Sequence, residues 1–171
     1  FAMPETAIGF FPDVGGSHFL PRLQGYLGTY LALTGARLKG ADVLHAGVAT
    51  HYAPSNALTE LINDLSDGHE RDLTVKHSVS TITVPFGQLA PFSLERHLEC
   101  IDRCFSRDSM EEIVAALQAE PKDVEFARQT LKTLSTLSPL SLKVTLQQMR
   151  LGSKLDLDEC LVMEFRISSH M

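Results

Sequence analysis

The sequence predicts an α/β fold whose first part mixes short strands and helices and whose second half is helical. Two segments, residues 1–3 and 48–52, have the apolar or alternating, β-branched pattern of short strands. Beyond residue 92, apolar residues recur three and four positions apart, which is the spacing of one face of a helix. The chain has 171 residues, of which 44% are hydrophobic and 21% charged. This length and composition are typical of a globular protein with a sizeable core.

The composition also limits the partners. The formal net charge is −6, and no basic stripe is present that would bind nucleic acid or an anionic lipid surface. No apolar run approaches the roughly 18 residues that a membrane helix needs. We therefore expect neither nucleic acid nor a membrane as a partner. The three cysteines, Cys100, Cys104 and Cys160, form an odd set without a disulfide framework, which favours a reducing compartment.

The two ends of the sequence predict an internal piece of a longer protein. The chain begins at Phe1 with no initiator methionine and no signal or transit pattern. It stops within the helix-like segment 163–171, without a cap or a polar tail. Targeting signals are therefore expected to lie outside this sequence.

Turn residues divide the first part into elements. Residues 1–3 form a short strand, and a loop separates it from a helix at 15–23. Pro21 is expected to interrupt that helix. The next helix covers residues 28–33, and Gly35 is a fitting stop.

Two further elements precede the helical half. A short helix opens at Asp42 and is closed by Gly47, and residues 48–52 follow as the second strand. Ser55 or Asn56 is expected to cap another helix. Its apolar residues stand at helical spacing: Leu58, Leu61, Ile62 and Leu65.

The composition changes at residue 66, where a polar stretch leads into a segment with Pro85, Gly87 and Pro91. This pattern predicts an exposed connection. The chain is accordingly divided into three parts: part of an α/β core at 1–65, a connecting segment at 66–92 and a helical region at 93–171.

Local signals mark three helix starts in the helical region. Ser109 to Glu112 is a capping box, Ser138-Pro139 combines a cap with a first-turn proline, and Asp156 to Glu159 is a second box-like start. Gly152 is the expected stop of the helix after Pro139. The apolar stripes, in chain order, are Leu94, Leu98, Ile101 and Phe105; Ile113, Val114 and Leu117; Val124, Ala127, Leu131 and Leu134; Leu142, Leu146 and Met149; and Leu161 and Phe165. These stripes need partners within the domain or on a neighbouring subunit.

The pair of carboxylates Glu5 and Asp13 is the candidate catalytic site of this sequence. Both acids lie among Phe, Ile, Met and Pro residues, and glycines on either side of Asp13 allow sharp turns. Burial among apolar groups raises the pKa of a carboxyl, which suits general acid/base or nucleophilic work. The structural alternative is that Asp13 caps the following helix and that Glu5 is an ordinary surface residue.

Other candidates give weaker signals. His97, Cys100 and Cys104 recur at helical spacing, but a zinc site needs about four ligands and no fourth stands out. We therefore expect packing cysteines and no metal site. The remaining candidates are expected to be polar packing residues or solvated cations: His18, His45 and His51, and Arg22, Arg37 and Lys39.

Several segments resemble the crotonase (enoyl-CoA hydratase/isomerase) superfamily. They are residues 4–23, which begin Pro4-Glu-Thr-Ala-Ile-Gly9; Leu31-Ala-Leu-Thr-Gly35; Arg37-Leu-Lys-Gly-Ala-Asp42; and Ala46-Gly-Val-Ala-Thr-His51. In the helical region, residues 138–143, 145–149 and 163–167 are similar to the thioester hydrolases of that superfamily.

The resemblance implies the C-terminal half of a crotonase-like ββα superhelix, followed by a helical region, in a possible homo-oligomer. It implies hydrolysis of a short 3-hydroxyacyl-CoA thioester in valine catabolism. CoA is then part of the substrate and there is no separate cofactor. It also implies a mitochondrial location, with a peroxisomal one left open.

The resemblance carries two active-site acids over to this sequence. Glu5 matches the nucleophile or general base, and Asp13 matches the residue that positions substrate or water, so both catalyse and bind substrate. The two backbone N–H groups of the family's oxyanion hole lie upstream of Phe1. We therefore expect the 171-residue chain alone to be inactive.

Three alternatives remain. Dienoyl- or enoyl-CoA isomerases and hydratases of the same superfamily also use acids at this spacing. A non-catalytic scaffold could bind acyl-CoA without turnover. A purely structural helical domain would leave Glu5 and Asp13 exposed and unperturbed.

Overall fold

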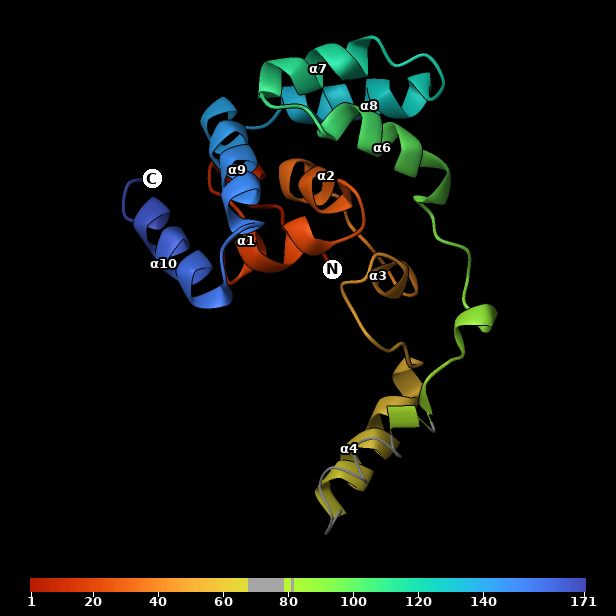
Figure 1. Ribbon diagram of the computed structural model, residues 1–171. Helices are drawn as coiled ribbons and strands as arrows, with labels where there is room; N and C mark the ends of the chain where they lie inside the picture. Colours follow the sequence, from red (N-terminus) through yellow and green to blue (C-terminus); the bar gives the residue numbers. More distant parts are fainter. Residues whose placement is uncertain (68–78, 81) are drawn as a thin grey trace. The chain divides into compact units, whose positions relative to one another are not determined.

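The computed structural model describes residues 1–67, 79–80 and 82–171 of the chain (Figure 1). In these ranges the regular structure consists of α-helices and 3₁₀-helices, without a strand. None of the described helices is long and apolar enough to cross a membrane.

The chain folds into two compact units, which comprise residues 1–39 with 93–171 and residues 40–92. The first unit contains both candidate acids. In chain order its helices are η1 (Glu5–Ile8), α1 (Gly16–Phe19), η2 (Leu20–Arg22), α2 (Leu27–Thr34), η5 (Glu95–His97), α6 (Leu98–Phe105), α7 (Met110–Gln118), α8 (Val124–Ser135), α9 (Pro139–Gly152) and α10 (Leu157–Ser168).

Helix α2 forms the centre of this unit. Every residue from Leu27 to Leu33 is buried, and the helix packs against η1, η2, α6, α8 and α9. The Tyr30 ring meets Phe105 of α6 edge-on at 5.4 Å between centroids and lies 5.5 Å from the ring of Phe126 of α8. Gly35 ends α2 in the left-handed conformation, with φ 63°. The predicted helix and its glycine stop are confirmed.

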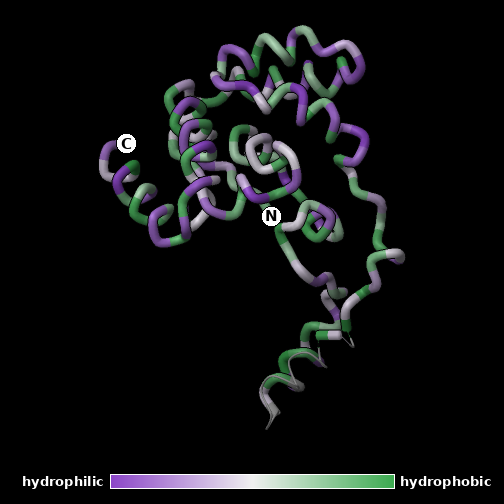
Figure 2. Tube along the Cα trace, in the orientation of Figure 1, coloured by the Kyte–Doolittle hydropathy of each residue, from purple (hydrophilic) through white to green (hydrophobic). Residues whose placement is uncertain are grey.

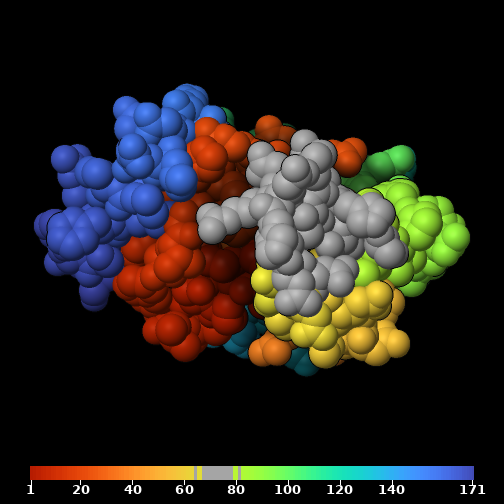
Figure 3. All heavy atoms as spheres, turned by 90° about the horizontal axis from the view of Figure 1, so that it is seen from below, coloured from red at the N-terminus to blue at the C-terminus, as the bar shows by residue number. Residues whose placement is uncertain are grey.

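Two glycines allow unusually close packing around the N-terminal segment. A Cβ atom on Gly28 would lie 1.7 Å from the carbonyl oxygen of Leu20, and one on Gly152 would lie 2.0 Å from that of Ser17. Helices α2 and α9 therefore touch the backbone of residues 17–20 directly. Figure 3 shows the N-terminal segment (red) beside the C-terminal helices (blue), in agreement with the contacts between α1 and α10.

The predicted helix starts are confirmed. Ser109 and Glu112 form a capping box at α7, and Asp156 and Glu159 form another at α10. The Ser138 hydroxyl accepts a hydrogen bond from the Ser141 N–H at the start of α9. Pro21 falls in η2, where the α1 helix tightens into a 3₁₀ turn. These signals involve residues only a few positions apart, so they act locally.

The apolar stripes are confirmed in part. Figure 2 shows polar and apolar residues alternating along α6, α7 and α8, and Ile101, Phe105, Ile113, Leu117 and Leu134 are buried. Three predicted core positions are instead exposed: Val124, Leu161 and Phe165. In α10 the buried residues are Cys160 and Glu164, so the predicted apolar face of that helix was wrong.

The second unit contains α3 (Asp42–His45), η3 (Ser55–Ala57), α4 (Leu58–Asp67) and η4 (Phe86–Gln88). The predicted cap at Ser55 or Asn56 was wrong, because both residues lie inside η3, which runs into α4. Residues 68–78 and 81 of the predicted connection lie outside the described residues. The division at residues 65 and 92 stays a prediction.

Both predicted strands were wrong. Phe1 exchanges two backbone hydrogen bonds with Leu38, of 2.8 and 2.9 Å, but this pairing does not continue along residues 1–3. The N–H groups of Val48 and Ala49 both donate to the Val43 carbonyl, closing the turn after α3. A strand needs a partner over several residues, and here the backbone groups are used in single pairs or local turns.

Candidate active site

Glu5 opens the short helix η1, which the surrounding residues hold in place. Gly9 closes η1 with φ 79°, and the Phe10 N–H donates to the Glu5 carbonyl at 2.9 Å. The buried Thr6 hydroxyl donates to the Leu33 carbonyl at the end of α2, at 3.2 Å. A bond across 27 residues thus fixes η1, and with it the backbone of Glu5, to the central helix.

The Glu5 carboxyl is in an environment that disfavours its charge. Its Oε2 atom is buried and has no hydrogen-bond partner among the described residues. Burial raises the pKa of Glu5; the Glu5 backbone N–H lowers it, and the negative charge of Asp13 raises it. A carboxyl with a raised pKa and a free buried oxygen is suited to take up a proton or to attack an electrophile.

Asp13 lies in a tight turn between Pro12 and α1. Val14 and Gly15 both have positive φ, 48° and 86°, and the Gly16 N–H donates to the Asp13 carbonyl at 2.8 Å. The Asp13 carboxylate makes no hydrogen bond to the part of the chain that the structure describes. The negative charge of Asp13 contributes to the raised pKa of Glu5, so the two carboxylates interact electrostatically.

The N-terminus of α1 is occupied by another acid, Glu164 from α10. Its carboxylate accepts from the N–H groups of Gly15 and Ser17, at 2.9 and 3.0 Å, and from the Ser17 hydroxyl. The structural alternative for Asp13 was therefore wrong, because Gly15 is the N-cap position and Glu164 supplies the carboxylate. Sequence reasoning missed Glu164; its one signal is an acid inside the apolar run 161–165.

The purely structural alternative for Glu5 and Asp13 is also wrong in one respect. It expected both acids to be exposed and unperturbed, whereas Glu5 has a buried oxygen and a raised pKa. Their catalytic roles stay predictions.

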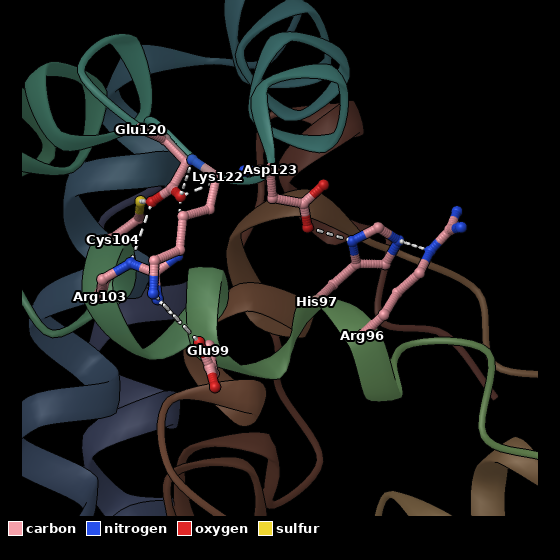
Figure 4. Close-up of polar contacts among 8 residues, drawn as sticks. All are labelled: Arg96, His97, Glu99, Arg103, Cys104, Glu120, Lys122 and Asp123. Carbon is pink, nitrogen blue, oxygen red and sulfur yellow. Dashed lines mark hydrogen bonds and ion pairs between the residues drawn. The ribbon is translucent and has the colours of Figure 1, made fainter.

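The cysteine pair on α6 forms a second buried cluster, with Glu120 (Figure 4). Ligand atoms of Cys100, Cys104 and Glu120 lie within 4.8 Å of one another. Burial raises the pKa of Cys100 to about 12, and the Arg103 hydrogen bond lowers that of Glu120 to about 2. Arg103 pairs with the Glu120 carboxylate at 2.7 Å, and the Cys104 thiol lies 3.9 Å from it. The cysteines are buried, as expected of packing residues, and the absence of a metal site stays a prediction.

Two of the histidines, His97 and His45, make contacts within the protein. The His97 ring stacks on Phe126 at 4.2 Å and pairs with Asp123 through Nδ1 (Figure 4). The His45 ring lies 4.8 Å from that of Phe86, and its Nε2 contacts the Ala90 carbonyl at 2.9 Å.

Arg22 is exposed, as expected for a solvated cation, but it also has partners in the protein. It donates to the carbonyls of His18, Gly152 and Leu155, at 2.5, 2.9 and 2.7 Å. Through these bonds it ties η2 to the end of α9. Arg37 and Lys39 are exposed, as expected.

Comparison with curated proteins finds 3-hydroxyisobutyryl-CoA hydrolases. The human mitochondrial enzyme is 48% identical over 98% of this chain, and 3-hydroxyisobutyryl-CoA hydrolase 1 of Arabidopsis thaliana is 43% identical over all of it. The chain spans 44% and 46% of the length of these two relatives.

Solved structures give the same fold family. A carnitinyl-CoA dehydratase from Mycobacterium thermoresistibile is 35% identical, with a TM-score of 0.84 over 96% of this chain and 46% of the other. An enoyl-CoA hydratase from Rhodobacter sphaeroides is 34% identical, with a TM-score of 0.74 over 95% of this chain and 44% of the other. The helices described above thus form the C-terminal part of a crotonase-like fold, as predicted. The family profile described as Enoyl-CoA hydratase/isomerase matches residues 1–171, and the chain belongs to that family.

Proposed function

We propose that the whole protein hydrolyses 3-hydroxyisobutyryl-CoA to 3-hydroxyisobutyrate and CoA, a step of valine catabolism, in mitochondria. Family membership and the names of relatives 48% and 43% identical to the chain support this substrate. The observation that carries the chemistry is the buried Oε2 atom of Glu5, which has no hydrogen-bond partner among the described residues. An unpartnered buried oxygen is costly to a fold, and a reaction that uses it explains its presence.

Glu5 can act by either of two routes. As a nucleophile, Oε2 attacks the thioester carbonyl carbon, the C–S bond breaks, CoA leaves as the thiolate and an acyl–Glu5 anhydride forms. Water then opens the anhydride, which releases the hydroxy acid and restores the carboxylate. As a general base, Glu5 instead takes a proton from a water molecule that attacks the thioester directly.

Asp13 is proposed to hold the substrate hydroxyl or the attacking water. Its carboxylate makes no hydrogen bond within the described residues, so its acceptor oxygens are available to a ligand. Its backbone, by contrast, is fixed by the bond from Gly16. An acid on a rigid turn with a free carboxylate can orient a hydroxyl or a water beside Glu5.

The described residues supply the acids of this site and not its oxyanion donors. We propose that two backbone N–H groups from a part of the protein outside this sequence stabilise the oxyanion. Because one such donor is worth about 10²- to 10³-fold in rate, the 171-residue chain alone is expected to be inactive. CoA enters as part of the substrate without a separate cofactor.

A second candidate function is addition of water to, or movement of, a double bond in an acyl-CoA. The structural neighbours favour it, because they are named as a dehydratase and a hydratase. The same two acids would then move protons at carbon atoms and leave the thioester intact.

One experiment separates the two functions. The whole protein is given 3-hydroxyisobutyryl-CoA in one arm and a dienoyl-CoA in the other, while free thiol and dienoyl absorbance are followed. We expect thiol release from the first substrate and no change in absorbance with the second. Loss of dienoyl absorbance without thiol release would instead establish the isomerase or hydratase function.

A further inference from the structure

The turn that presents Asp13 is in an unfavourable backbone conformation. Val14 has φ 48°, in the left-handed region, where a β-branched residue is rarely found. Val14 is 79% exposed, so packing of its side chain does not compensate. Contacts from residues outside the turn must therefore hold it in this conformation.

Two side chains from the C-terminal helices hold the turn from either side. Before Asp13, the buried Gln148 of α9 donates from Nε2 to the Pro12 carbonyl at 2.6 Å. After Val14, the buried Glu164 of α10 accepts from the Gly15 N–H through Oε2, at 2.9 Å. These bonds span 136 and 149 residues of sequence.

The Glu164 carboxylate both caps α1 and bonds to the strained turn. Oε1 of Glu164 accepts from the Ser17 N–H at 3.0 Å, as a helix cap does. Its other oxygen, Oε2, reaches the residue directly after Val14. That bond fixes the peptide between Val14 and Gly15. It thereby helps to fix the backbone from which the Asp13 side chain projects.

We propose that Glu164 is a positioning residue: its carboxylate holds the strained turn 12–17 in the conformation from which the Asp13 carboxylate projects. The inference rests on the proposed function of Glu5 and Asp13. Helix α10, at the far end of the sequence, thereby sets the geometry of an active site at the start of it.

The test compares two substitutions in helix α10 of the whole protein. Glu164→Gln keeps the shape of the side chain but leaves one oxygen, which we expect to stay with the two donors of Ser17. The bond to Gly15 is then lost. The matched control is Glu159→Ala, which removes the carboxylate that accepts from the Asp156 N–H at 3.0 Å and weakens α10 without touching the turn.

Two readouts are taken below the melting temperature of every variant. The first is hydrogen–deuterium exchange of the peptide that covers residues 12–17, and the second is thiol release from 3-hydroxyisobutyryl-CoA. For Glu164→Gln we expect faster exchange of that peptide and a kcat that falls about 10- to 100-fold, with KM changed far less. Glu159→Ala should match the wild type in both.

A second variant keeps the test decisive if Glu164→Gln also loses stability. Glycine tolerates positive φ, so adding Val14→Gly to Glu164→Gln should slow the exchange again and recover part of the lost kcat. Wild-type kcat in Glu164→Gln despite faster exchange, or unchanged exchange, would overturn the positioning role. If the wild type itself releases no thiol, the proposed function fails, and the exchange data alone decide whether Glu164 holds the turn.

Discussion

Substitution of Gly152 by alanine is expected to disturb both stability and activity, because α9 and α1 touch there without a side chain between them. A Cβ atom on residue 152 would lie 2.0 Å from the carbonyl oxygen and 2.8 Å from the carbonyl carbon of Ser17. Cβ contacts shorter than 3.0 Å are essentially never seen, so the two segments must separate by about 1 Å.

The sign of the stability change follows from two opposing effects. Helix propensity alone favours alanine over glycine by about 0.5–1 kcal/mol. Overpacking costs about 1–3 kcal/mol, and the upper part of that range applies here because the obstructing atoms are backbone. We expect a net loss of about 1–2 kcal/mol in the free energy of unfolding. A shift of about 1 Å beside the Asp13 turn should also lower kcat by about 10- to 100-fold.

Urea unfolding and thioester hydrolysis of the whole protein measure these two effects. Gly87→Ala is the matched control, since a Cβ at residue 87 meets no atom within 4 Å. We expect the control to stay within about 0.5 kcal/mol of the wild type. A Gly152→Ala protein as stable and as active as the wild type would refute the close contact.

Three further predictions concern charge. Asp13→Asn removes the charge that raises the pKa of Glu5, so the acid limb of the kcat/KM profile should move to lower pH; an unmoved limb would show that the acids are not coupled. Glu5 has a raised pKa in the folded state, so its ionisation lowers stability as pH rises through that pKa. Glu5→Gln should therefore unfold at a higher urea concentration than the wild type at pH 8 and at the same concentration at pH 4, and equal midpoints at pH 8 would contradict this. Arg103→Ala leaves buried Glu120 without its 2.7 Å ion pair and should lower the urea concentration at which the protein unfolds at pH 7. The lowered pKa of Glu120, about 2 against an ordinary 4.5, makes the wild type lose stability as pH falls from about 4.5 to 2. This loss should shrink in Arg103→Ala, and an identical pH dependence would count against the pair.

Features that depend on near neighbours in the sequence could be predicted. The capping boxes at Ser109 and Asp156 and the glycine stop at Gly35 were all found, since each is decided within a few residues. The two acids Glu5 and Asp13 could be predicted as candidates for the same reason, because the apolar residues around them lie in the same short segment.

Features that depend on distant residues were missed. The strand at residues 1–3 was predicted from an apolar pattern, but a strand also needs a continuous partner. Among the described residues, the backbone of Phe1 pairs with Leu38 alone. In α10, Leu161 and Phe165 have the spacing of a buried helix face but are exposed. Glu164 is buried instead, because the N–H groups of Gly15 and Ser17, about 150 residues earlier, need an acceptor. No periodicity within α10 carries that information.

The rate of thiol release from 3-hydroxyisobutyryl-CoA, compared between the whole wild-type protein and Glu5→Gln, tests most directly whether the buried Glu5 oxygen carries the chemistry. Glutamine keeps the size of the side chain but can neither attack the thioester as a carboxylate nor take a proton from water. We predict that Glu5→Gln folds as the wild type does by circular dichroism and loses at least about 10²-fold in kcat. Near-normal hydrolysis by a folded Glu5→Gln protein would contradict the assignment.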